Sequence, residues 1–146
     1  MDSTSVLFIC NHNAARSQMA EAWLNRLGEG RFQAESAGFE PTRVNPYVVE
    51  VMREAGIDIG QAQSDDVFEF YKDGRRYHYT ITVCDQSLAE RCPIFPGLVL
   101  GGRLHWSFAD PESFTGTDDE ILEQTRQVRD SIRRQVEAFI ASSKPQ

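Results

Sequence analysis

A segment close to the N-terminus has the residue types and the spacing of an anion-binding loop that carries a nucleophile. A cysteine, Cys10, is followed by five residues, an arginine and a serine. Five residues can curl so that successive backbone N–H groups point at one oxyanion, and the planar Arg16 guanidinium can grip two oxygens of that anion. The residues expected to surround the anion are Asn11, His12, Asn13, Ala14, Ala15, Arg16 and Ser17.

The sulfur of Cys10 is the predicted nucleophile of this loop. A helix N-terminus and a nearby arginine both favour the thiolate over the thiol, and the Ser17 hydroxyl can donate a hydrogen bond to it. The competing interpretation makes Cys10 a core thiol and Arg16 a surface residue of a helix. An apolar strand pattern before the loop and an amphipathic helix pattern after it disfavour that alternative.

Composition and charge restrict the classes of protein to which the chain can belong. Its 146 residues have the size of one domain, and 40% hydrophobic with 25% charged residues excludes an intrinsically disordered chain. A net charge of −7 argues against nucleic-acid binding, and no run approaches the about 20 apolar residues of a membrane span. The first five residues carry no basic side chain, so we expect no secretory signal and a cytoplasmic protein. Its three cysteines are then expected to be catalytic, metal-bound or inert rather than bridged, and the absence of CxxC spacing argues against a zinc site.

The loop lies between a strand pattern and a helix pattern. Val6–Ile9 is a short apolar run, typical of a strand that is buried on both faces. Met19, Trp23 and Leu27 recur at helical spacing, and Gly28 is expected to end that helix. A nucleophile between a strand end and a helix start has the position that ligand sites usually have in α/β folds.

Later segments continue the alternation of strands and helices. The further predicted elements are a strand over Phe32–Ala37, a helix opened by Asn45-Pro46, a strand over Tyr77–Val83, a strand over Leu98–Leu100 or Leu104–Phe108, and a final helix opened by the capping box Thr117–Glu120. The apolar stripe of that final helix comprises Ile121, Thr125, Val128, Ile132, Val136, Phe139 and Ile140. This order predicts an α/β sandwich around a mainly parallel sheet, in a single domain over residues 1–146.

The loop and two further segments resemble one known family. Cys10–Ser17 followed by Gln18–Trp23 resembles the phosphate-binding loop of the low-molecular-weight protein tyrosine phosphatase superfamily, and especially of its thioredoxin-coupled arsenate reductases. Ser36–Gly38 matches the end of the family's second strand, and His105–Pro111 resembles its acid-bearing loop. The resemblance implies a flavodoxin-like three-layer sandwich, with a four-stranded parallel sheet in the order 2-1-3-4 flanked by helices.

Two loop residues depart from the pattern of that family. Many members have glycine at the position of His12 and a second cysteine at the position of Ala15. His12 therefore suggests an altered loop shape or altered contacts with the leaving group. The thiol that Ala15 replaces is not one that the reductase chemistry requires.

Asp110 is the predicted general acid. Alone, Asp110-Pro111 would indicate only the opening of a turn. In the family that the chain resembles, an aspartate in such a loop faces the nucleophile and protonates the leaving oxygen, which leaves poorly without that proton. Asp118 and Asp119 are better explained as acidic residues in the first turn of a helix.

Two further cysteines distinguish a reductase from a phosphatase. Cys84 ends the third predicted strand and is expected at the same sheet edge as Cys10, and Cys92 follows eight positions later. The alternative is a pair of unrelated thiols. A helix over residues 84–92 would hold the two Cα atoms about 12 Å apart, and a disulfide needs roughly 4.4–6.8 Å. A Cys84–Cys92 bond therefore requires this segment to loop or unwind.

The resemblance implies reduction of arsenate to arsenite for arsenic detoxification. The implied route is a thiol–disulfide relay through Cys10, Cys84 and Cys92 that thioredoxin regenerates, with phosphate or sulfate as competing oxyanions. The first alternative is a tyrosine phosphatase that uses Cys10, Arg16 and Asp110. Two others are a non-catalytic oxyanion or redox sensor, and a reductase in which glutathione or mycothiol supplies the second thiol.

The resemblance also bears on cofactors and partners. No tightly bound cofactor is expected, but the reductases of this family often bind a potassium ion near the loop. Asn13, Glu21, Ser36 and Asp65 match that pattern. We expect a monomer that binds neither nucleic acid nor membranes.

Overall fold

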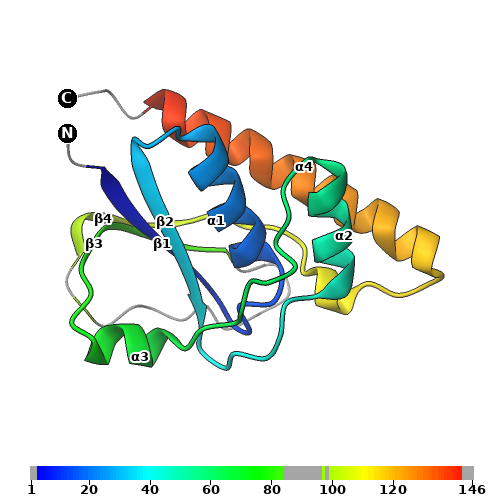
Figure 1. The fold of residues 1–146 in the computed structure, drawn as a ribbon, viewed down its shortest axis with the longest axis horizontal. Helices are drawn as coiled ribbons and strands as arrows, with labels where there is room; N and C mark the ends of the chain where they lie inside the picture. The colour runs from blue at the N-terminus through cyan, green and yellow to red at the C-terminus, as the bar shows by residue number, and fades with distance from the viewer. Residues whose placement is uncertain (1–2, 84–96, 98, 143–146) are drawn as a thin grey trace.

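A parallel sheet of four strands forms the centre of the computed structural model, which describes residues 3–83, 97 and 99–142 (Figure 1). The strand order is β2-β1-β3-β4, and each neighbouring pair is parallel. The strands are β1 (Thr4–Cys10), β2 (Phe32–Gly38), β3 (Tyr77–Thr82) and β4 (Val99–His105). The observed order confirms the fold class that the sequence predicts.

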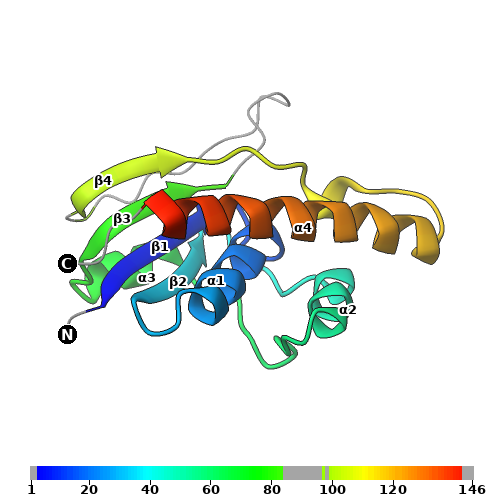
Figure 2. The same cartoon turned by 90° about the horizontal axis from the view of Figure 1, so that it is seen from above.

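Helices cover both faces of this sheet and make three layers (Figure 2). Side chains of α1, α2 and α4 pack with one face of β1 in the larger core cluster, whereas α3 packs on the opposite face with Leu7 and Ile9. The helices are α1 (Arg16–Leu27), α2 (Pro46–Glu54), α3 (Val67–Lys72) and α4 (Asp118–Ser142), with a short 3₁₀ helix, η2, over Pro111–Ser113. No helix in the described part of the chain is both long and apolar enough to cross a bilayer.

The hydrophobic patterns explain why β1 lies inside the sheet and why α4 packs on the sheet through one stripe. Val6–Ile9 are all fully buried, as expected for a strand covered on both faces. Five positions of the predicted stripe of α4 are buried, namely Thr125, Val128, Ile132, Val136 and Phe139. Trp106 lies beyond β4, and its ring contacts the rings of Phe8 and Phe139 at centroid distances of 5.6 and 5.8 Å.

Local capping signals set the starts of two helices. The Asn45 side chain accepts hydrogen bonds from the N–H groups of Tyr47 and Val48, so α2 begins where the Asn45-Pro46 pair predicts it. Thr117 and Glu120 exchange backbone-to-side-chain hydrogen bonds of 3.1 and 3.2 Å, which is the reciprocal pattern of a capping box. Gly28 caps the C-terminus of α1, also as predicted.

Strand β4 differs from both ranges that the sequence suggests for it. It runs from Val99 to His105 and includes Gly101 and Gly102, which interrupt the apolar pattern. A Cβ atom at Gly101 would lie 2.7 Å from the His78 carbonyl oxygen, so the close approach of the two strands requires glycine there. The register also shifts between Tyr77 and Tyr79, at an irregularity that the sequence does not indicate.

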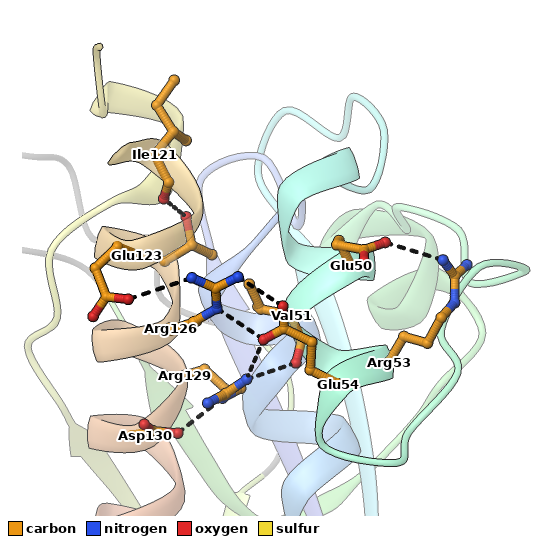
Figure 3. Close-up of polar contacts among 10 residues, drawn as sticks. Glu50, Val51, Arg53, Glu54, Ile121, Glu123, Arg126, Arg129 and Asp130 are labelled. Atoms are coloured by element: carbon orange, nitrogen blue, oxygen red, sulfur yellow. Dashed lines mark hydrogen bonds and ion pairs between the residues drawn. The ribbon is translucent and has the colours of Figure 1, made fainter. Parts of the chain in front are cut away.

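A group of ion pairs joins α2 to α4 on the outside of the helical layer (Figure 3). Glu54 accepts two hydrogen bonds from Arg126, at 2.9 and 2.8 Å, and one of 3.1 Å from Arg129. Arg129 also donates to the Val51 carbonyl oxygen at 2.9 Å. These contacts hold the pKa of Glu54 below its usual value, and they fix α2 against the long helix.

Candidate active site

The predicted nucleophile and the predicted arginine lie at the two ends of one loop. Cys10 is the last residue of β1, and Arg16 is the first residue of α1. Both residues are 3% exposed. The five residues between them form the loop that the sequence predicts, at the carboxyl edge of the parallel sheet.

Residues outside the loop bind its carbonyl oxygens. The carbonyl oxygens of Asn11, His12 and Ala14 accept from the backbone N–H groups of Glu40, Thr42 and Asn45 at 2.7, 3.2 and 2.9 Å. The Asn13 carbonyl oxygen accepts from Ser64 Oγ at 2.9 Å and Gln18 Nε2 at 3.1 Å. In a planar trans peptide the carbonyl and the following N–H point in opposite directions. The N–H groups of residues 12–15 are therefore turned toward the inside of the loop, where they form an oxyanion cradle.

Gly38, at the end of β2, supports this cradle from behind. A Cβ atom there would lie 2.8 Å from both the Asn11 carbonyl oxygen and the Asn13 nitrogen. The loop backbone therefore packs directly on the glycine of the Ser36–Gly38 segment, and any side chain would displace it.

Asn13 locks the cradle in its shape. Its backbone has φ 51°, a left-handed conformation that asparagine adopts more readily than most residues. Its side-chain oxygen accepts from the Asp65 N–H at 2.8 Å and from Gln18 Nε2 at 3.1 Å, and its amide donates to Ser17 Oγ at 2.8 Å. Since Asn13 is fully buried, these bonds hold the loop without competition from water.

The Cys10 sulfur lies 2.9 Å from Ser17 Oγ. Because Ser17 Oγ already accepts a hydrogen bond from Asn13, its own hydrogen is available to donate to a thiolate. A donor that is oriented in this way stabilises the ionised sulfur. The predicted role of Ser17 therefore has a geometric basis.

The structure places Asp110 beside Arg16. Asp110 Oδ2 lies 3.3 Å from Arg16 Nη2, and the Phe108 carbonyl oxygen accepts from Arg16 Nη1 at 3.2 Å. Asp110 Oδ1 accepts from the Glu112 N–H at 2.9 Å, which caps η2. Asp110 thus opens a turn and also lies at the cradle, so the two interpretations of this residue do not exclude each other.

A small pocket lies at the mouth of the cradle. Its lining residues are Cys10, His12, Ala14, Ala15, Arg16, Asp110 and Glu112. His12 Nδ1 lies 2.9 Å from the Glu40 carbonyl oxygen, so this nitrogen carries the hydrogen and donates it. Glu112 is the lining residue that the sequence does not predict, although it follows Asp110-Pro111 directly.

The residues matched to a potassium site do not fit an ion equally well. Ser36 Oγ donates to Glu21 Oε1 at 2.8 Å, and burial raises the pKa of Glu21 to about 7, with Asp65 and Glu35 adding to the rise. Burial also raises the pKa of Asp65. A cation would relieve this loss of solvation, so Glu21, Ser36 and Asp65 fit one. Asn13 is already engaged in more contacts, because its two oxygens accept hydrogen bonds from the Asp65 N–H and Ser64 Oγ and share the Gln18 amide.

The other two cysteines, Cys84 and Cys92, lie outside the described residues, so their part in a relay stays a prediction. The described end of β3 shows at which edge of the sheet the chain approaches Cys84. Thr82 is paired with Ile9, next to Cys10, and the Val83 N–H donates to the Ile9 carbonyl oxygen at 2.9 Å. The chain therefore leaves β3 at the sheet edge that carries the cradle, two residues before Cys84.

The cradle and its sulfur define a class of enzyme, one that holds a tetrahedral oxyanion against a cysteine. The family model of low molecular weight phosphotyrosine protein phosphatases matches residues 5–146, and the chain belongs to this family.

Similar proteins within this class are arsenate reductases. The arsenate reductase of Halalkalibacterium halodurans is 35% identical over 144 residues, which cover 99% of this chain and 100% of that protein. A solved arsenate reductase in the phosphate-binding state is 31% identical with a TM-score of 0.77, and the match covers 97% of this chain and 99% of the other. The thioredoxin-dependent arsenate reductase of Corynebacterium glutamicum is 27% identical with a TM-score of 0.59, covering 94% of this chain and 63% of that one.

Proposed function

We propose that the protein reduces arsenate to arsenite and is regenerated by thioredoxin. The observation that carries the proposal is the cradle, in which inward N–H groups, Arg16 and the Ser17-bonded sulfur of Cys10 surround one small pocket. The similarity to arsenate reductases over almost the whole chain supports arsenate as that anion. The thioredoxin dependence of the Corynebacterium enzyme supports the reductant.

The chemistry begins at the sulfur that the cradle holds. The Cys10 thiolate attacks arsenic, and Asp110 supplies a proton to the departing oxygen, so that water leaves and an S–As bond forms. The cradle N–H groups and Arg16 stabilise the negative oxygens throughout. The arsenic is still pentavalent at this stage.

Electrons are transferred in the second step. Cys84 as thiolate attacks the Cys10 sulfur, the S–As bond breaks, and its electron pair stays on arsenic, which leaves as trivalent arsenite. The two sulfurs remain as a Cys10–Cys84 disulfide. Cys92 then attacks Cys84 and forms Cys84–Cys92, which releases the Cys10 thiolate, and the dithiol of thioredoxin reduces the new disulfide.

Thiol counting tests this proposal. Without reductant, one equivalent of arsenate should consume two thiols of the wild type, because one two-electron reduction oxidises two sulfurs. Arsenate-dependent oxidation of a thioredoxin system should be lost in Cys10→Ser and Cys84→Ser. Cys92→Ser should complete one turnover and then stop. Sustained turnover of Cys92→Ser with thioredoxin would show that Cys92 takes no part in the relay. Turnover with glutathione or mycothiol alone would show that this thiol, and not thioredoxin, is the reductant.

A phosphatase is the second candidate, and the family match favours it. Cys10, Arg16 and Asp110 suffice for that activity, since a thiol–phosphate intermediate needs only water to break down. Hydrolysis of an aryl phosphate by Cys84→Ser at the wild-type rate, with no thiols lost on adding arsenate, would establish the phosphatase and refute the reductase.

Further expectations accompany the proposal. Phosphate and sulfate compete with arsenate for the cradle, and the protein acts in the cytoplasm as a monomer, which light scattering of the purified chain tests. Where a potassium ion binds, Glu21, Ser36 and Asp65 would hold it, and it would offset the negative charge of the two carboxylates, whose pKa values are raised. Equal thermal stability in potassium and sodium buffers would contradict this site.

A further inference from the structure

Glu112 gives the pocket a hydrogen-bond acceptor beside its many donors. It lines the pocket together with Cys10 and Arg16. Its Oε2 atom accepts a hydrogen bond from the Asn45 side-chain amide. Glu112 is exposed, and its Oε1 atom makes no hydrogen bond to any residue that the structure describes, so this oxygen can accept one from a ligand in the pocket.

The partner that orients Glu112 is itself rigidly held. Asn45 is 4% exposed. Its Oδ1 atom accepts from the N–H groups of Tyr47 and Val48 at the start of α2, and its own N–H donates to the Ala14 carbonyl oxygen at 2.9 Å. Because Oδ1 must face those helix N–H groups, the amide nitrogen must face Glu112. The same residue therefore fixes the cradle backbone and the carboxylate at its mouth.

The other carboxylate of the pocket is already engaged. Asp110 uses Oδ1 to accept from the Glu112 N–H and Oδ2 to pair with Arg16. The inward N–H groups of the cradle and the Arg16 guanidinium are all donors. An oxyanion that also carries a hydrogen therefore finds in Glu112 an acceptor that these groups do not provide.

From this arrangement, and on the basis of the oxyanion reaction proposed above, we propose that Glu112 selects oxyanions that carry a proton, such as arsenate and phosphate, against sulfate. The hydrogen of a protonated oxyanion donates to the Glu112 carboxylate. Sulfate at neutral pH has no hydrogen to donate, so its oxygens face a carboxylate with no hydrogen between them, and the like charges repel. Sulfate should therefore bind to the cradle more weakly than phosphate does.

Binding of inorganic phosphate and sulfate to the reduced full-length protein tests the selection. At about pH 8, above the second pKa of a phosphate group, both ions are mainly dianions, and only phosphate carries a hydrogen. Isothermal titration calorimetry should show sulfate binding at least about tenfold more weakly than phosphate to the wild type. In Glu112→Gln the acceptor for Asn45 is retained, and the new amide can donate to sulfate. We expect the ratio of the two dissociation constants to fall to about one, mainly through tighter sulfate binding.

Asp119→Asn is the matched control. It removes one negative charge from the first turn of α4, and Asp119 does not line the pocket. Its ratio should equal that of the wild type. An unchanged ratio in Glu112→Gln, with phosphate still bound, would overturn the selection and leave the reductase proposal intact. A wild type that binds neither ion would overturn both proposals.

Discussion

The cradle and the junction between α2 and α4 both depend on polar contacts, but the two regions differ in burial. Asn13 and Ser17 are fully buried, and Arg16 is 3% exposed. The side chains of Glu54 and Arg126 at the junction are about one-third exposed. A buried polar group loses its water and must have its partner, whereas an exposed ion pair contributes little because water competes for both charges. Changes in the cradle should therefore affect function strongly, and changes at the junction should affect only stability.

The largest effect is expected from Arg16→Lys. Lysine keeps the charge but cannot grip two oxygens in one plane, so kcat/KM for arsenate should fall by about 10²–10³. Steady-state kinetics with the thioredoxin system measures this change, and a melting curve close to that of the wild type excludes unfolding as its cause. A lysine variant with nearly full activity would show that the cradle needs only a positive charge.

Gly38→Ala tests whether the cradle depends on the backbone behind it. The new Cβ would lie 2.8 Å from the Asn11 carbonyl oxygen, so the loop must shift, at a cost of about 1–3 kcal/mol in the free energy of unfolding. Oxyanion affinity should fall by about tenfold with it. Gly102→Ala is the control, because a Cβ at Gly102 would meet nothing within 4 Å. Equal phosphate affinity in both variants would contradict this role for Gly38.

Glu21→Gln measures the cost of the partly buried carboxylate that accepts a hydrogen bond from Ser36. The pKa of Glu21 is raised from 4.5 to about 7, so the folded state binds the proton more tightly than the unfolded state does. The carboxylate therefore lowers stability as pH rises from 4.5 toward 7. In buffer without potassium, the glutamine variant should be more stable than the wild type by about 3 kcal/mol at about pH 8 and nearly equal at about pH 4. Urea unfolding at both pH values tests this, and a difference that does not vary with pH would refute it.

The smallest effect is expected at the junction. Glu54→Ala removes the bonds to Arg126 and Arg129 and should lower the free energy of unfolding by about 1 kcal/mol, without changing kcat/KM. Since the folded pKa of Glu54 is lowered, its contribution is present above the unfolded pKa and is lost as pH falls through the folded one. Denaturation at neutral and acid pH measures this.

Glu50→Ala is the control, because it breaks only the exposed Glu50–Arg53 pair, and its free energy of unfolding should change less. A loss of activity in Glu54→Ala would contradict the expectation that changes at the junction affect only stability.

Much of the fold could be predicted because its signals are local. The run Val6–Ile9, the Asn45-Pro46 pair and the Thr117–Glu120 box each specify their element within a few residues. The position of β4 could not be fixed, because its two glycines interrupt the apolar pattern. Helix α3 has only six residues, which is too short for helical periodicity to be recognised.

The cradle could be predicted as a loop, but not its supports. Cys10, Arg16 and Ser17 have a recognisable spacing. Glu40 and Thr42 hold the loop through their backbone N–H groups, which leave no trace in residue type. Glu112 reaches the pocket through its contact with Asn45, 67 positions away, and no local pattern specifies such a pairing. The roles of Cys84 and Cys92 stay predictions from the sequence.

The contact between Arg16 and Asp110 couples two events that would otherwise be independent. Arg16 stabilises the bound oxyanion in the proposed reaction, and its Nη2 atom also lies 3.3 Å from the Asp110 carboxylate. One side chain therefore serves both anion binding and the placement of the general acid, so a substitution at Arg16 disturbs the two together.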